Sequence, residues 1–161
     1  MAYPMLALRY SDDSAPEGGT VEAHQRVMKA EGYVWLGKRG KPIASSRVAE
    51  MSKEIEARGS IEVILARRTK WHVVMHAAEI TAVAAALPAD ELSRVPAYYR
   101  AKAGAVGTWF RVVDFRKIQR DESAVLVVAS SGKPLFSAVR NSMCTNFWVN
   151  SSARGSGSAV P

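Results

Sequence analysis

The amino-acid sequence predicts an α+β fold in which a curled mixed or antiparallel sheet, or a small β-barrel, is flanked by helices. About six short segments are rich in β-branched and aromatic residues and are joined mostly by short polar turns, which is typical of a sheet. About three other segments repeat apolar residues every three or four positions, as amphipathic helices do. No internal repeat is present. These observations together predict a single α+β arrangement.

Length and composition predict one domain over residues 1–150. The chain has 161 residues, of which 48% are hydrophobic, and this is enough for one core of ordinary size. Residues 151–161, SSARGSGSAVP, have the composition of a linker and are predicted to form a disordered tail.

Glycines and turn residues set the expected element boundaries. Gly32 and Gly59 each follow a helical pattern, where a C-terminal glycine is expected. The second helix is expected to begin near Ser45 or Ser46. Strands are predicted over residues 33–36, 61–65, 71–76, 109–115, 124–129 and 147–149, and helices over 21–30, 47–57 and 135–142.

Four further segments carry expectations of their own. Residues 1–10 are expected to form an edge strand or an extended arm. Residues 79–86 favour a strand because they contain β-branched residues. The run at 124–129, AVLVVA, is almost wholly apolar and is therefore predicted to be buried on both faces. Residues 87–107 are predicted to form a long irregular connection, with or without one helical turn, and such loops are often functional.

Charge favours a polyanionic partner. The formal net charge is +7 and the sequence pI is about 9.8, which favours nucleic acid. The single cysteine, Cys144, fits a reducing compartment. No apolar run approaches the roughly 18 residues of a membrane span, and the first residues lack the pattern of a secretory signal. We therefore expect a cytoplasmic protein without a membrane partner.

Catalytic residue patterns are scarce, so the sequence predicts a protein that is not an enzyme and uses no metal or cofactor. His72 and His76 are expected to lie about 13 Å apart along one strand, too far to share a metal ion. Cys144 is expected to be a small buried hydrophobe rather than a nucleophile. The glycine-lysine segments GKRGKP and SSGKPL lack the spacing of a phosphate-binding loop.

The stretch YVWLGKRGKPIASSR, residues 33–47, carries the strongest functional signal. Alternation along the strand places Tyr33 and Trp35 on one face, where they are expected to line a base pocket. The cations that follow are expected to contact phosphate, and the hydroxyls at the start of the next helix to read base edges. These residues are Lys38, Arg39 and Lys41 for phosphate, and Ser45 and Ser46 for the base.

Tryptophans near cations extend this interpretation. Trp71 and Trp109 are expected to add to the base pocket, and Arg68 and Lys70, in the loop before Trp71, to contact phosphate. Large side chains are also needed to fill a curled sheet, so a core role for any one tryptophan stays open. Trp35 is the first candidate for exposure in a pocket.

The order of these segments resembles the PUA-like superfamily, in particular its EVE, YTH and ASCH branches. The resemblance rests on an aromatic strand, a short polar loop with serine, a helix, a hairpin, and a later strand, TWFRVVDFRKI. It implies a small curled barrel that holds a modified, flipped base in an aromatic cage, with Trp35 as a cage wall. It also implies a targeting role in a restriction or defence system, with a separate nuclease or translocase as partner. DNA is favoured over RNA.

Three functions stay open from the sequence. The first is a nucleic-acid-binding module that recognises a modified base and performs no catalysis. The second is a protein-interaction or regulatory module whose exposed aromatic residues meet a protein partner. The third is a small nuclease or nucleotide-processing enzyme that uses an acid such as Asp114 or Glu79.

Overall fold

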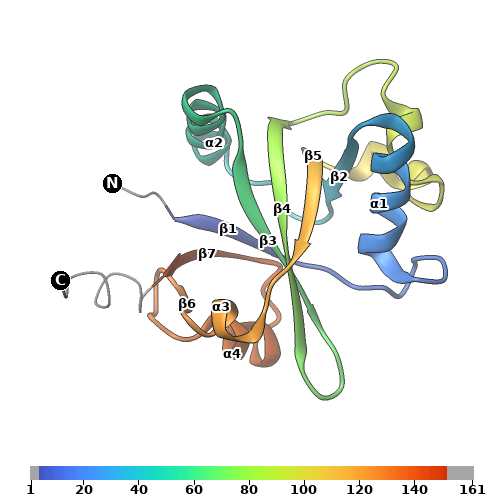
Figure 1. Ribbon diagram of the computed structural model, residues 1–161. Coiled ribbons are helices and arrows are strands. Elements are labelled where there is room, and N and C mark those ends of the chain that lie inside the picture. The colour runs from blue at the N-terminus through green and yellow to red at the C-terminus, as the bar shows by residue number, and fades with distance from the viewer. Residues whose placement is uncertain (1–3, 152–161) are drawn as a thin grey trace. The chain divides into compact units, whose positions relative to one another are not determined.

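The computed structural model describes residues 4–151, which form helices and a seven-stranded mixed sheet (Figure 1). The α+β class and the mixed sheet predicted from the sequence are confirmed. In chain order the elements are β1 Met5–Arg9, α1 Gly19–Glu31, β2 Val34–Lys38, α2 Ser45–Arg58, β3 Ile61–Arg68, β4 Val73–Ala84, η1 Leu92–Arg94, η2 Ala97–Ala105, β5 Thr108–Lys117, α3 Arg120–Ala124, β6 Leu126–Val128, α4 Leu135–Asn141 and β7 Asn146–Ser151.

The strands are hydrogen-bonded in the order β2-β5-β4-β3-β1-β7-β6. This order has two ends, so the sheet is not closed, and the predicted alternative of a small barrel does not hold. β1 runs parallel to β3 and antiparallel to β7. The expectation of an edge strand or arm at residues 1–10 is therefore wrong for the described part of that segment. Leu6, Ala7 and Leu8 are buried, which explains why this strand lies inside the sheet.

The chain divides into two compact units, each described here by itself. Unit 1 comprises residues 4–10, 63–77 and 116–151 of the described chain. Its core joins the buried faces of β1, β3 and β7 to α4, which contributes the fully buried Leu135 and Val139. In Figure 1, α3 and α4 lie beside β6 and β7.

The apolar run at 124–129 forms only the short strand β6, at one end of the sheet order. Leu126 and Val128 are buried, whereas Val127 is half-buried. The prediction of burial on both faces is therefore wrong. The run is apolar because it packs against α4 and the rest of the unit 1 core.

Unit 2 comprises residues 11–62 and 78–115. β2 pairs antiparallel with β5, in a register that places Trp35 opposite Arg111. α1 packs on β2, and α2 buries Met51 completely. Gly32 and Gly59 end the two helices in left-handed conformations with φ of 90°, as the sequence predicts.

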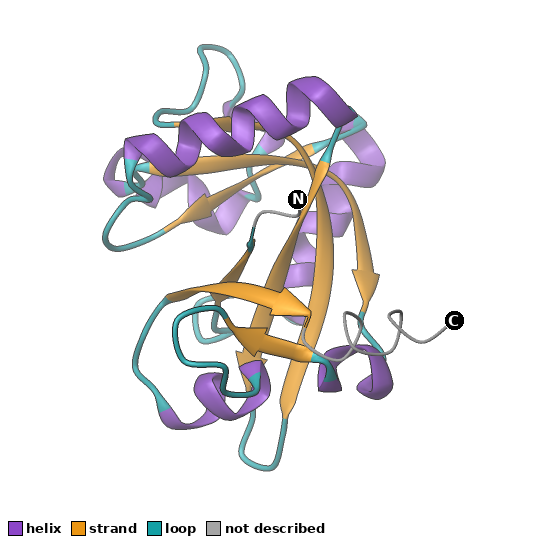
Figure 2. Cartoon of the chain, turned by 90° about the vertical axis from the view of Figure 1, so that its left-hand side faces the viewer, coloured by secondary structure: helices purple, strands orange, loops and turns teal. Residues whose placement is uncertain are grey.

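The predicted hairpin is present as β3 and β4, with its loop visible at the tip of two long strands (Figure 2). The two segments predicted over 71–76 and 79–86 are one continuous strand that begins at Val73. Trp71 and His72 therefore belong to the turn. Two 3-10 helices, η1 and η2, lie within residues 87–107, which were predicted to form an irregular connection.

Most of the predicted tail, residues 152–161, lies outside the described part of the chain. One domain over residues 1–150 stays a prediction. No helix within residues 4–151 is long and apolar enough to cross a membrane.

Candidate functional site

The turn between β3 and β4 is organised by the hydroxyl of Thr69. This hydroxyl donates a hydrogen bond to the carbonyl of His72 at 2.8 Å and accepts from the backbone N–H groups of Trp71 and His72 at 3.3 and 2.9 Å. The backbone N–H of Thr69 also reaches the His72 carbonyl, at 2.7 Å. Threonine hydroxyls commonly stabilise turns in this way. The turn therefore holds Lys70 and Trp71 at the tip of the hairpin.

Arginine side chains join this hairpin to the C-terminal end of α4. Arg68 Nη1 donates to the backbone carbonyl of Arg140 at 3.0 Å, and Arg140 Nη1 donates to the backbone carbonyl of Trp71 at 3.0 Å. Arg9 Nη1, from β1, donates to the carbonyl of Ser142. The bonds from Arg68 and Arg9 satisfy carbonyls at or just beyond the end of α4, which have no partner within a helix, and the bond from Arg140 ties the helix to the hairpin turn.

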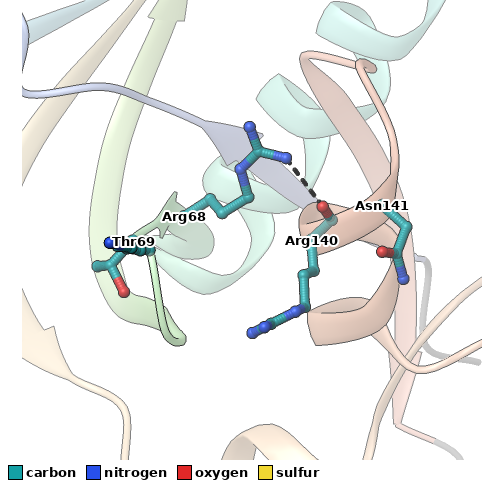
Figure 3. Close-up of a pocket in the computed structure, with 5 residues that line it drawn as sticks. Arg68, Thr69, Arg140 and Asn141 are labelled. Atoms are coloured by element: carbon teal, nitrogen blue, oxygen red, sulfur yellow. Dashed lines mark hydrogen bonds between the residues drawn. The ribbon is translucent and has the colours of Figure 1, made fainter.

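An open, polar pocket of about 440 Å³ lies between the hairpin tip and α4. Figure 3 shows Arg68 and Thr69 of the hairpin facing Arg140 and Asn141 of α4, with the bond between Arg68 and the Arg140 carbonyl. Lys70 completes the lining, and no carboxylate takes part in it. None of the three cations forms an ion pair with another residue of the described chain. The pocket therefore concentrates positive charge that no residue within 4–151 neutralises through an ion pair.

Trp71 offers a large exposed aromatic surface beside this pocket. Its side chain is 75% exposed, and the Lys70 ammonium lies 5.0 Å from the centre of its ring. A cation at this distance from an indole is attracted to the ring face. The predicted phosphate contacts Arg68 and Lys70 and the predicted base contact Trp71 thus lie together in unit 1.

The other predicted aromatic residues lie in unit 2, in a closed cluster. Trp35 is 3% exposed and Trp109 is fully buried. Both belong to an apolar cluster with Tyr99, whose ring meets Trp109 edge-on with centroids 6.3 Å apart. The expectation that Trp35 is exposed is wrong, because η2 and β5 supply the side chains that cover it. Its role in a base pocket stays a prediction.

Tyr33 marks the partly exposed margin of that cluster. The carboxylate of Glu91 accepts hydrogen bonds from the Tyr33 hydroxyl at 2.6 Å, from Trp35 Nε1 at 2.9 Å and from Arg94 at 2.8 Å. The guanidinium groups of Arg94 and Arg111 lie 4.6 and 5.1 Å from the centre of the Tyr33 ring.

These hydrogen bonds shift the pKa values of both Tyr33 and Glu91. The hydrogen bond to Glu91, followed by burial, raises the pKa of Tyr33. The hydrogen bonds from Tyr33 and Trp35 lower the pKa of Glu91, because they favour its ionised form. A carboxylate held in its charged form can accept a hydrogen bond from an amino group, and the neighbouring aromatic ring and guanidinium groups can stack on a planar ligand.

The cations of the basic loop after β2 differ in burial. Lys38 is 5% exposed, and its ammonium donates to the backbone carbonyls of Arg39 and Lys41. Burial lowers the pKa of Lys38. Its predicted contact with phosphate is not available in this conformation, because Lys38 instead fixes the loop. Arg39 and Lys41 are exposed.

Ser45 and Ser46 form the exposed first residues of α2, where the sequence predicts a helix start. The residue before the helix is Ala44, and no side chain caps the helix. The serine hydroxyls are therefore not needed for capping, and base reading by them stays a prediction.

The structure brings together site residues that the sequence does not connect. Arg140 and Asn141 come from a helix about 70 positions after the hairpin, and no local pattern predicts that the two segments meet. Glu91, Arg94 and Arg111 surround Tyr33 from two other elements. The charged residues of the long connection at 87–107 were the one available signal for this group.

Residues named for possible catalysis are scattered. Cys144 is exposed, which corrects the expectation of a buried thiol. Asp114 is exposed on β5 and Glu79 is half-buried on β4. Within residues 4–151, no three histidine, cysteine, aspartate or glutamate side chains gather as metal ligands would.

Comparison with known protein families gives one match for this sequence. The sequence profile of the family described as Pua-like matches residues 6–146, which is most of the chain. The chain belongs to the Pua-like family. Domains of this family generally bind nucleic acids, and the predicted resemblance to PUA-like proteins is confirmed, while the EVE, YTH and ASCH branches stay a prediction. No curated protein and no solved structure matches this Pua-like chain closely enough to name a nearer relative.

Proposed function

We propose that this Pua-like protein is a nucleic-acid-binding module that recognises a modified base and performs no catalysis of its own. The observation that carries the proposal is the pocket of Arg68, Lys70 and Arg140, three cations without a carboxylate partner. Phosphate groups are the natural counterpart of such a site, because guanidinium and ammonium groups bind their oxygens through charge-assisted hydrogen bonds. Membership in the Pua-like family supports the same class of ligand.

The base itself is assigned to the group around Tyr33. A base taken out of its stack is read by planar groups on its face and by hydrogen bonds on its edge. The Tyr33 ring and the guanidinium groups of Arg94 and Arg111 supply the planar surfaces. The Glu91 carboxylate supplies an acceptor that stays ionised. The indole N–H of the buried Trp35 donates a hydrogen bond to that carboxylate and fixes its position.

A module of this kind needs an effector to act on what it binds. We assign that role to a separate nuclease or translocase, with the present protein as the targeting part of a restriction or defence system. DNA is the favoured ligand. This part of the proposal rests on the resemblance to modified-base readers and on the absence of a recognisable catalytic pattern in the sequence.

The test is fluorescence anisotropy with matched oligonucleotides, one unmodified and others carrying methylated or hydroxymethylated bases, at two salt concentrations. The wild-type protein should prefer one modified strand, and the preference should persist at the higher salt. Glu91→Gln should abolish the preference, because it removes the charge that accepts from the base edge. Trp35→Ala is a poorer probe, since emptying a buried tryptophan site costs about 3–5 kcal/mol of stability.

Lys70→Gln should instead weaken binding to every strand and reduce the salt slope by about 0.7–0.9, the value of one phosphate contact. Lys133→Gln is the matched control, because it removes the same charge at the opposite, N-terminal side of α4. Equal effects of the two lysine changes would refute a specific phosphate pocket. Equal affinity of the wild-type protein for all strands would refute modified-base recognition.

A further inference from the structure

Exposed apolar side chains gather in unit 1, on or just after the hairpin and the helix that line the cationic pocket. Within residues 4–151 four large hydrophobic side chains are exposed, and three of them belong to this unit. Trp71 stands at the hairpin tip with 75% of its surface exposed, and Phe136 lies on α4 with 49% exposed. Met143, 86% exposed, follows two residues after the end of α4. Exposed aromatic residues beside unpaired cations mark a binding surface rather than a solvated one.

Arg140 connects the two aromatic side chains. Its guanidinium donates to the backbone carbonyl of Trp71 at 3.0 Å. Phe136 precedes Arg140 by four residues on α4, so the two side chains project from the same face of the helix, about 6 Å apart along its axis. One exposed aromatic residue therefore lies on the hairpin that lines the pocket, and another lies on the helix that lines it.

This arrangement selects among anionic ligands. In a duplex the faces of the bases are covered by their neighbours, and a protein meets mainly the backbone and the base edges. In an unpaired strand the base faces are free and stack on aromatic side chains, while the phosphates between them meet cations. A pocket of about 440 Å³ is within the size range of sites for small ligands.

We propose that this surface of unit 1 binds an unpaired nucleic-acid strand. One base stacks on Trp71, a neighbouring base stacks on Phe136, and the phosphate between them occupies the pocket of Arg68, Lys70 and Arg140. The inference rests on the proposed nucleic-acid binding and specifies the ligand of this surface as an unpaired strand. Lys70 already lies on one face of the Trp71 ring, so the base takes the remaining face or displaces this side chain.

The experiment measures affinity for three labelled ligands of equal length by fluorescence anisotropy. They are a single strand, the same sequence in a blunt duplex, and a single strand whose central nucleotides lack bases but keep their phosphates. The single strand should bind at least tenfold more tightly than the duplex and the abasic strand.

Two variants separate stacking from charge. Trp71→Ala and Phe136→Ala should each weaken binding of the single strand about 5- to 150-fold, the range measured for loss of one base stack. Neither should change the salt slope or the affinity for the abasic strand. Leu92→Ala is the matched control, because Leu92 is an exposed hydrophobic residue of unit 2. All three positions are exposed, so circular dichroism should show unchanged folding.

Each other outcome overturns a defined claim. Equal or tighter binding of the duplex refutes the unpaired strand but leaves the proposed function standing. Equal binding of the abasic strand refutes stacking. Failure to bind any strand refutes the proposed function itself. Tighter binding of a polyglutamate peptide than of any strand assigns the surface to an acidic protein partner and refutes the inference.

Discussion

Acidification from pH 7 to pH 5 should weaken the folded state through one buried imidazole, that of His24. The side chain is 1% exposed, and its Nδ1–H donates to the backbone carbonyl of Thr20 at 2.8 Å. The rings of Tyr99 and Phe115 lie edge-on with centroids 6.4 and 6.5 Å away. Nε2 has no hydrogen-bond partner among the described residues. Burial lowers the pKa of His24 from 6.5 to about 4, although the bond to Thr20 partly opposes the shift.

The direction of the change in the free energy of unfolding follows from which state, folded or unfolded, binds the proton. Below pH 6.5 the unfolded chain protonates His24 while the folded chain does not, so the free energy of unfolding falls as the pH falls toward 4. Between pH 7 and pH 5 the loss amounts to about 2 kcal/mol, from the two pKa values and the linkage relation. Below pH 4 both states carry the proton and this contribution no longer changes.

Urea unfolding at pH 7 and pH 5, followed by tryptophan fluorescence, measures the effect. Trp35 and Trp109 belong to the same unit as His24, so the emission reports on the relevant core. A loss of about 2 kcal/mol moves the midpoint by about 1 M urea for a slope of 2 kcal/mol per M. Because carboxylates also titrate in this range, the comparison is between the wild-type protein and His24→Gln.

The glutamine variant keeps a side-chain donor for the Thr20 carbonyl but does not titrate between pH 7 and pH 5. Its free energy of unfolding should fall with acidification by about 2 kcal/mol less than that of the wild-type protein. His72→Gln is the control, because that histidine is exposed in the hairpin turn. Parallel pH dependences of the wild-type protein and His24→Gln would refute the argument from burial.

Two further changes test the packing and the turn that position the sites. Gly37→Ala should lower the free energy of unfolding by about 1–3 kcal/mol, because the added Cβ would lie 3.0 Å from a Trp109 ring carbon. Gly104→Ala is the control and should leave the free energy of unfolding unchanged, because no atom lies within 4 Å of the added Cβ. Urea unfolding of the pair would contradict this reasoning if both variants behaved alike. Thr69→Val should weaken single-strand binding severalfold while leaving the salt slope unchanged, because the hydroxyl that fixes the turn at Trp71 is lost but no cation is. An altered slope in anisotropy titrations would show that the turn acts through charge instead.

Local signals predicted most of the elements and one part of the candidate site. Cap glycines and β-branched runs placed the helices and the hairpin to within a few residues, because both depend on neighbours in the chain. Arg68, Lys70 and Trp71 were predicted together for the same reason, since they occupy one short loop. Arg140 was not, because its approach to that loop depends on how α4 packs on the unit 1 core.

Burial was the property that sequence patterns predicted least well. Alternation showed correctly that Tyr33 and Trp35 belong to one face of a strand, but it does not show what covers that face. η2 and β5 cover Trp35 and leave Tyr33 at the margin. The burial of His24 was not predicted either, because a polar residue within a helical segment gives no sign that its side chain will be covered.

The net charge of +7 becomes informative only when its distribution is considered. Exposed Arg–Glu pairs at helical spacing use part of the basic charge locally, and such pairs contribute little to stability or to the field around the molecule. These pairs are Arg26–Glu22, Arg47–Glu50 and Arg58–Glu54. Lys38 is withdrawn into its own loop. The three cations of the pocket between the hairpin and α4 are different because the residues that line this pocket include no acid. The positive charge that is free to attract an anion is therefore set by where the described residues lack a neighbouring carboxylate, and not by the total number of lysines and arginines.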